Sequence, residues 1–228
     1  MPKVPLFPLN VVLFPGMILP LHIFEERYKA MVNDCIASGD PFGVVLVPED
    51  AEEAQQTPYC SVGTVAHINE VERLSDGRMN IIVLGRQRFS ISHIVQHEPY
   101  LVAEVDFYAM EQASARPGSA EAERNRRLMN QVRGLLPGYL DLLGQNLGRS
   151  ISIGRMPSGI ASVAYLVAIV LQIPLWEKQA LLEVSTYGEL LLQEEALLRR
   201  ETLFLQYAVD TAPREDSLWP YPPSIMAN

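Results

Sequence analysis

Side chains with the chemistry of a metal site are few in this sequence. The four histidines are His22, His67, His93 and His97, and only the last two lie close together in the chain. We expect His93 and His97 on a strand and the turn after it, where their spacing separates them by about 13 Å along the strand. Because a metal ion needs three or four converging ligands, the pair does not predict a metal site.

The usual patterns of catalysis are also missing. The sequence contains no GxxxxGK[ST] or GxGxxG phosphate loop, no HExxH and no GxSxG. A serine–lysine pair would need one of three lysines, and none has suitable neighbours in the sequence. The acidic runs are typical of solvated faces, although folding can bring distant carboxylates together, so a hydrolase is the third hypothesis. We expect no enzyme activity, no cofactor and no metal.

Composition limits the class of protein and its partners. The 228 residues are 48% hydrophobic and 20% charged, enough for one large or two small domains with true cores. The net charge of −9 makes nucleic acid an unfavoured partner. Cys35 and Cys60 form no CxxC pair, which favours a reducing compartment. The apolar run 160–173 is too short to span a bilayer, so we expect a cytoplasmic protein without membrane contact.

Strand patterns dominate the first half of the chain. Short β-branched or alternating runs are separated by glycine, proline and aspartate, and Asp76-Gly77 predicts a tight hairpin turn. One helix over 24–39, ending at Gly39, interrupts the strands, and the acidic segment 48–58 predicts an exposed loop. The predicted strands are Val11–Phe14, Met17–Ile23, Phe42–Val47, Ser61–Leu74, Met79–Leu84, Phe89–Gln96 and Leu101–Tyr108.

The stretch PLFPLNVVLFPGMILPLHIFEERY, residues 5–28, combines apolar side chains with repeated prolines. Proline cannot donate to a strand ladder, so we expect short edge strands with tight corners at Pro5, Pro8, Pro15 and Pro20. In FPGM, residues 14–17, proline and glycine stand where a turn requires them. This segment would hold apolar side chains near the surface; the alternative is that they all belong to the core.

Helix patterns follow a linker of small residues that begins at Glu111. Ser119 is expected to cap a helix into the 140s that Gly134 and Pro137 kink or divide. Further helices are predicted over 159–172, after Pro174 and over 187–208, and a proline-rich tail follows.

Arginines after the linker support an alternative function. Arg124 and Arg127 share a helical face, and Arg86 and Arg88 from the strand half would join them in an RNA-binding surface. The alternating Glu121 and Glu123 are equally consistent with a salt-bridged, solvated helix.

Four segments resemble a known family. PLFPLNVVLFPGMILPLHIFEERYKAM, GVVLV, VGTVAHI and DGRMNIIVLGRQRFSI, in this order, resemble the N-terminal substrate-binding domain of Lon-type ATP-dependent proteases, also found in standalone bacterial proteins and in cereblon. The similarity continues more weakly through PLWEKQALLEV, so that it covers roughly Pro5 to Arg200. In the proteases this domain recognises substrates, whereas ATP hydrolysis and cleavage belong to later domains, which we expect this chain to lack together with cereblon's zinc ligands.

The resemblance implies an α+β fold in which a PUA-like β pseudo-barrel with one inserted helix is followed by a C-terminal α-helical bundle. The expected divisions are 1–112 for the barrel, 113–210 for the helical subdomain and 211–228 for the tail.

We therefore predict a non-catalytic polypeptide-binding protein, adaptor or chaperone-like, that captures unfolded or exposed hydrophobic segments near the junction of barrel and helices. The leucine-rich helices are also compatible with a homo-oligomer. The expected peptide-binding residues are Phe14, Pro15, Met17, Phe24 and Tyr28, and the nucleic-acid alternative would use Arg86, Arg88, Arg124 and Arg127.

Overall fold

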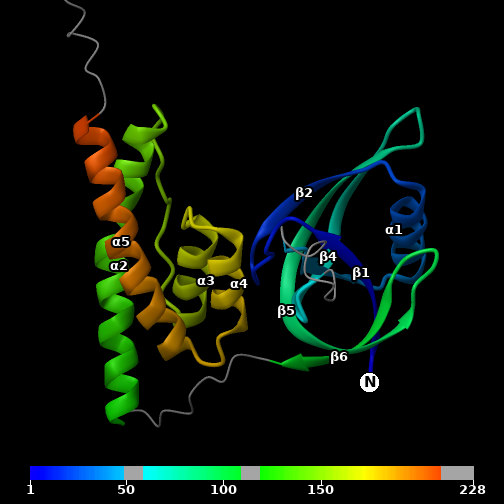
Figure 1. Ribbon diagram of the computed structural model, residues 1–228, viewed down its shortest axis with the longest axis horizontal. Helices are drawn as coiled ribbons and strands as arrows, with labels where there is room; N and C mark the ends of the chain where they lie inside the picture. The colour runs from blue at the N-terminus through cyan, green and yellow to red at the C-terminus, as the bar shows by residue number, and fades with distance from the viewer. Residues whose placement is uncertain (49–58, 109–118, 212–228) are drawn as a thin grey trace, which may run out of the picture.

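The computed structural model describes residues 1–48, 59–108 and 119–211 (Figure 1). All of its strands come from the first half of the chain and four of its helices from the second, which confirms the α+β class. The elements are β1 (Lys3–Leu9), β2 (Ile18–Ile23), α1 (Glu26–Ser38), β3 (Phe42–Leu46), β4 (Val62–Arg73), β5 (Met79–Gln96), β6 (Val102–Tyr108), α2 (Ala120–Asn146), α3 (Ile160–Val170), α4 (Leu175–Glu183) and α5 (Tyr187–Thr211).

Five strands pair in a closed cycle. The sheet has the order β2-β5-β4-β3-β1-β6, and β6 pairs with β5 as well as with β1. The ladder β1, β3, β4, β5 and β6 therefore returns to its start, and we call it the strand ring. The long β5 makes this possible, because its first half pairs with β2 and its second half pairs with β6. β1 and β3 run parallel, and the other pairs are antiparallel.

The expectation that Pro5 and Pro8 mark an edge strand is wrong. Both lie in β1, which pairs with β6 over Lys3–Pro5 and with β3 over Leu6–Leu9. Because the two partners hardly overlap along β1, each part of the strand is paired mainly on one side, and prolines are tolerated there. Pro20 does lie in an edge strand, since β2 pairs with β5 alone.

The segment Val11–Phe14 is not a strand, contrary to the prediction, yet its side chains alternate between two cores. Leu13 packs with the core formed by the strands and α1, whereas Val12 and Phe14 pack with the helical core. This segment lies between the strand ring and the helices and contributes side chains to both cores, which explains why all four of its residues are apolar.

The two turns predicted from glycine are present. Gly16 has φ 84°, and the amide of Met17 donates to the carbonyl of Phe14 at 3.0 Å, which closes the FPGM turn. Gly77 has φ 82° in the connection between β4 and β5. The carboxylate of Asp76 accepts hydrogen bonds from the backbone and side chain of Arg78. The helix end predicted at Gly39 is also present.

Four helices form the second part of the molecule. Ser119 caps α2 by accepting a hydrogen bond from the amide of Ala122, as predicted, and α2 continues undivided through Pro137. Figure 1 shows α2 and α5 side by side, with α3 and α4 between them and the strand ring. The expected boundary at 112 and nearly all of the expected tail lie outside the described residues.

Candidate functional site

Arg88 attaches the helices to the strand ring. It lies on β5 and is only 1% exposed, and its Nη1 donates to the carbonyl oxygens of Leu182 and Val184 at 2.6 and 2.7 Å. Its guanidinium carbon also lies 4.6 Å from the ring centre of Tyr108. The end of α4 is thus fixed to β5 by charge-assisted hydrogen bonds.

Gln179 makes a second attachment between the same two parts. Its Nε2 donates to the carbonyl of Val62 on β4 at 3.1 Å and to Oε1 of Glu183 at 2.7 Å. Both neighbours are acceptors only, so the amide nitrogen must face them. Gln179 Oε1 is buried and has no hydrogen-bond partner among the described residues.

A first groove lies beside these contacts, and we call it the α4 groove. It has a volume of about 570 Å³, and α4 forms one wall while the end of β3 and residues just after β1 and just before β4 form the other. Trp176, at the start of α4, is 70% exposed on its rim. The lining residues are Asn10, Leu46, Val47, Pro48, Cys60, Pro174, Leu175, Trp176, Gln179, Ala180 and Glu183.

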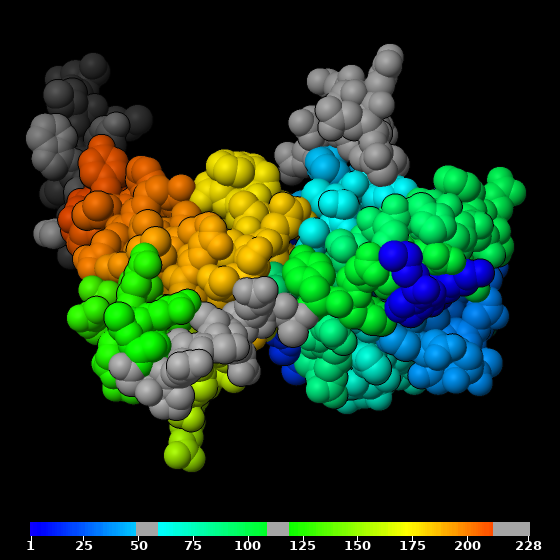
Figure 2. Space-filling view, turned by 90° about the horizontal axis from the view of Figure 1, so that it is seen from below, coloured from blue at the N-terminus to red at the C-terminus, as the bar shows by residue number. Residues whose placement is uncertain are grey.

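A second groove, the α3 groove, contains the FPGM corner. Its volume is about 490 Å³, and Pro15 and Gly16 line it opposite α3. The helical side is largely apolar and includes Tyr165, Leu166 and Ile169. Figure 2 shows the α3 and α4 region, in yellow, directly against the strand ring, so both grooves lie where the two parts of the chain meet.

One thiol and two phenols at this junction have raised pKa values. Burial raises the pKa of the Cys60 thiol, and the carboxylate of Glu183 raises it further. Burial likewise raises the pKa of Tyr108 and of Tyr165, although the positive charge of Arg88 opposes both increases. A thiolate at Cys60 or a phenolate at either tyrosine is therefore disfavoured at neutral pH.

Two of the predicted peptide-binding residues are buried, which corrects the expectation for them. Phe14 is 0% exposed because the FPGM turn docks on β5: Gly16 donates to the carbonyl of Gly85 at 2.8 Å, and Gly85 donates to Met17 at 2.9 Å. Tyr28 is 8% exposed and packs on Phe7, with 4.2 Å between ring centres. Neither side chain presents a surface to a peptide.

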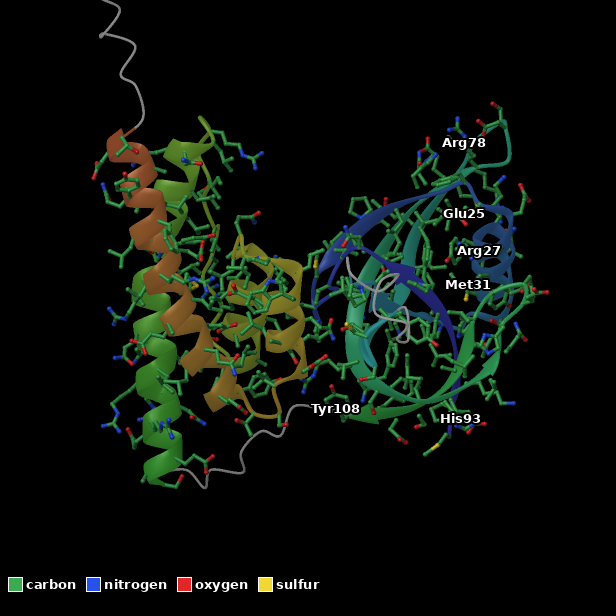
Figure 3. All side chains as sticks on the ribbon, in the orientation of Figure 1. Glu25, Arg27, Met31, Arg78, His93 and Tyr108 are labelled. Atoms are coloured by element: carbon green, nitrogen blue, oxygen red, sulfur yellow. The ribbon has the colours of Figure 1, made fainter. Side chains whose placement is uncertain are left out.

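The other three predicted residues lie in different places. Pro15 lines the α3 groove, and Met17 is half-buried and packs against both neighbouring cores. Phe24 is 60% exposed beside His22, just before α1. In Figure 3 the labelled Glu25 and Arg27 lie across the strand ring from the helices, so Phe24 belongs to a separate surface.

The arginines of the RNA-binding alternative are not brought together. Arg88 is buried and bound to backbone carbonyls, which corrects its expected exposure, whereas Arg86 is exposed on the same strand. Arg124 and Arg127 are exposed on α2, in the helical layer farthest from the strand ring. The arrangement therefore does not support a common nucleic-acid surface.

The sequence prediction missed Trp176, Gln179 and Glu183. They stand at positions i, i+3 and i+7 of α4 and share one helical face. The pattern that would have indicated the α4 groove is an aromatic, an amide and a carboxylate side chain on one face of a short helix.

No metal site or membrane span is found within 1–48, 59–108 and 119–211. No three side chains of histidine, cysteine, aspartate or glutamate are placed to hold a metal. His93, labelled in Figure 3, has its Nε2 3.7 Å from a carboxylate oxygen of Glu104. None of the helices in those ranges combines the length and apolarity needed to cross a bilayer.

Two solved structures resemble this one. The Lon N-terminal domain protein from Xanthomonas campestris has a TM-score of 0.60 and 25% identity, covering 86% of this chain and 98% of that chain. The N-terminal domain of the Mycobacterium avium complex Lon protease has a TM-score of 0.56 and 19% identity, covering 87% and 98%, which shows a shared fold.

Sequence relatives point the same way. Lon protease 2 of Myxococcus xanthus is 30% identical over 212 residues, covering 91% of this chain and 25% of that protein. The Lon protease of Flavobacterium johnsoniae is 33% identical over 123 residues, covering 53% of this chain and 15% of that protein. The chain thus spans a quarter or less of the length of these relatives. The family described as the ATP-dependent protease La (LON) substrate-binding domain matches residues 3–200, and this chain belongs to that family.

Proposed function

We propose that this protein is a non-catalytic polypeptide-binding protein, an adaptor or chaperone-like module, whose ligands are unfolded or exposed hydrophobic segments. Membership of a substrate-binding family supports the class of ligand. The junction between strand ring and helices supports the place of binding, because two open and mainly apolar grooves occur there.

One observation carries this proposal: Trp176 is 70% exposed on the rim of the α4 groove. A large aromatic side chain left in water loses the free energy that burial would provide, about 25 cal/mol per Å² of apolar surface. A polypeptide segment laid in the groove would cover Trp176 together with Leu175 and Pro48. Exposed aromatic side chains of this kind are common anchors of protein contacts.

The α3 groove would extend the same binding surface. It brings Pro15 and Gly16 of the predicted FPGM edge next to the apolar face of α3. The FPGM corner then contributes through its backbone and Pro15, since the Phe14 side chain is committed to the helical core. Affinity should be modest, because an extended ligand loses conformational freedom on binding.

The finer description of the fold belongs to the same proposal. The closed cycle of strand pairings supports a PUA-like pseudo-barrel, and the shared core of α2, α3 and α5 supports a helical bundle. We propose the divisions 1–112, 113–210 and 211–228 for the barrel, the helical subdomain and the tail, and a cytoplasmic location.

Self-association is also proposed, through the end of α5. Leu203, Phe204 and Tyr207 are 73%, 63% and 72% exposed there, on neighbouring positions of one helix. A second copy would cover these side chains in a self-complementary contact. A strictly monomeric mass in light scattering at high protein concentration would exclude it.

The function is tested by titrating a fluorescein-labelled, permanently unfolded test protein and following its anisotropy. The variant Trp176→Ala should bind at least about fivefold more weakly, a loss of roughly 1 kcal/mol. Phe24→Ala is the matched control, since it removes an aromatic side chain that is 60% exposed and lies outside both grooves. Circular dichroism and thermal unfolding must show both variants folded.

Two results would count against the proposal. Failure of the unaltered protein to bind at any concentration up to hundreds of micromolar would remove the function. Unchanged binding by Trp176→Ala would remove the α4 groove as its site.

A further inference from the structure

We propose that the α4 groove selects hydrophobic segments that carry a lysine or arginine, and that Glu183 recognises the positive charge. This inference rests on the proposed function and adds the chemical class of its ligand. It is drawn from the charges, hydrogen bonds and exposed apolar surface of the groove.

The charge that lines the α4 groove is negative. Among the lining residues that the structure describes, Glu183 is the only charged one, and it is exposed. The negative charge of Glu183 acts across the groove, since it raises the pKa of the Cys60 thiol on the opposite wall. The chain as a whole carries a net charge of −9, so long-range attraction also favours a cationic ligand.

Nearby cations are engaged elsewhere. Lys178 on α4 donates to the carbonyl of Ile169 at 3.1 Å, toward α3. Arg200 pairs with Glu177 and Glu201. Arg88 is buried and its Nη1 is bound to Leu182 and Val184, while its Nε and Nη2 have no hydrogen-bond partner among the described residues. Glu183 makes no salt bridge with any described residue, so its charge is left for a ligand.

Gln179 positions this carboxylate. Its Nε2 donates to Oε1 of Glu183 at 2.7 Å while also binding Val62 on the strand side, which fixes the carboxylate relative to both walls. Gln179 Oε1, 95% buried as part of its residue, is an acceptor without a donor among the described residues. The member of this pair that faces solvent is the exposed carboxylate of Glu183, an acceptor that complements the donors of an ammonium or guanidinium group.

Helix stability does not explain Glu183. It is the last residue of α4, where the helix dipole disfavours a negative charge. A carboxylate held at an unfavourable helix end by a buried amide is better explained by contact with a cation.

Trp176 complements the rest of such a ligand. Lysine and arginine carry a long aliphatic stem that packs on apolar surface while the charged end reaches a polar partner. Trp176 is on the same helical face as Glu183, seven residues or two turns away, and its exposed indole can accept that stem or a cation–π contact. Apolar neighbours in the ligand would then contact Leu46, Val47 and Leu175.

The test uses three fluorescent peptides with one apolar core, flanked by lysine and arginine, by glutamine and asparagine, or by glutamate and aspartate. Dissociation constants are measured for the full chain and for Glu183→Gln, with Glu121→Gln as control because Glu121 is exposed on α2. We expect the basic peptide to bind about fivefold tighter than the neutral one at low salt, and the acidic one weakest. Glu183→Gln should remove the difference between basic and neutral peptides, and Glu121→Gln should preserve it.

The outcomes separate the two proposals. Equal binding of basic and neutral peptides would overturn the selectivity and leave polypeptide binding intact. A preference that survives Glu183→Gln would overturn the role of Glu183. If none of the peptides binds, the proposed function itself fails.

Discussion

Arg88 on β5 donates a hydrogen bond to the carbonyl oxygen of Leu182 on α4 at 2.6 Å, across the junction that forms the grooves. A second bond from the same nitrogen reaches Val184. Arg88 is the only fully buried arginine of the strand ring, and its hydrogen bonds attach the helices to that ring.

Replacing Arg88 by methionine should destabilise the fold. The change keeps an apolar stem and leaves the Leu182 and Val184 carbonyls without their donor, at a cost of roughly 2–4 kcal/mol. Chemical denaturation measures it. Arg86→Met, at an exposed position on the same strand, should change stability by less than about 0.5 kcal/mol. Equal stabilities for the two variants would contradict the attachment role.

Gly85 tests how the FPGM corner docks. A Cβ atom at this position would collide with the carbonyl oxygen of Phe14, so Gly85→Ala should cost about 1–3 kcal/mol. Gly134→Ala is the control: the position is an exposed one inside α2 with open space around it, and alanine should stabilise the helix by about 0.5–1 kcal/mol. The thermal midpoints of the two variants should therefore move in opposite directions, and a shared direction would contradict the docking.

Glu194 should make stability depend on pH. Its side chain is fully buried in the helical core, and burial raises its pKa well above the usual value. The folded state then holds a proton that the unfolded chain releases above a pH of about 4.3, so this group lowers stability as pH rises from there. Glu194→Gln should flatten the decrease in unfolding free energy between pH 5 and 8. A parallel pH profile in both proteins would exclude this role.

The two thiols should differ in reactivity. Cys35 is 3% exposed and burial raises its pKa to about 11, whereas Cys60 is half-buried in the α4 groove. A maleimide should therefore label Cys60 first, as peptide mapping can show. Glu183→Gln should increase its rate about twofold, because a neighbouring negative charge no longer opposes the thiolate. An unchanged rate would show that Glu183 does not act on the groove.

The sequence predicted turns, helix ends and caps better than it predicted which side chains are buried in tertiary contacts. Turn and cap residues act locally, so Gly16, Gly39 and Ser119 indicated the observed turn, helix end and cap. Phe14 and Met17 are both apolar residues that flank Pro15 and Gly16, so the sequence does not distinguish them. Phe14 is buried because the FPGM turn docks on Gly85. Arg88 was mistaken for a surface residue because its partners, Leu182 and Val184, lie 94 and 96 positions away in the chain.

The candidate site was predicted only in its general location. The junction of strands and helices was expected, but the α4 groove depends on residues from the end of β3, the segment before β4 and α4 that no local pattern connects. Trp176 was assigned to a helix and its exposure was not foreseen, since the opposite face of α4 is set by tertiary packing of Leu181 and Leu182.

The most direct test of the central claim is the emission of Trp176 in the Trp219→Phe variant, in which it is the single tryptophan. The protein is titrated with a non-fluorescent, unfolded polypeptide free of tryptophan. We predict a saturable blue shift, because the bound segment removes the 70% exposed indole from water. An emission maximum that stays constant while an independent assay detects binding would show that the polypeptide binds elsewhere and contradict the account.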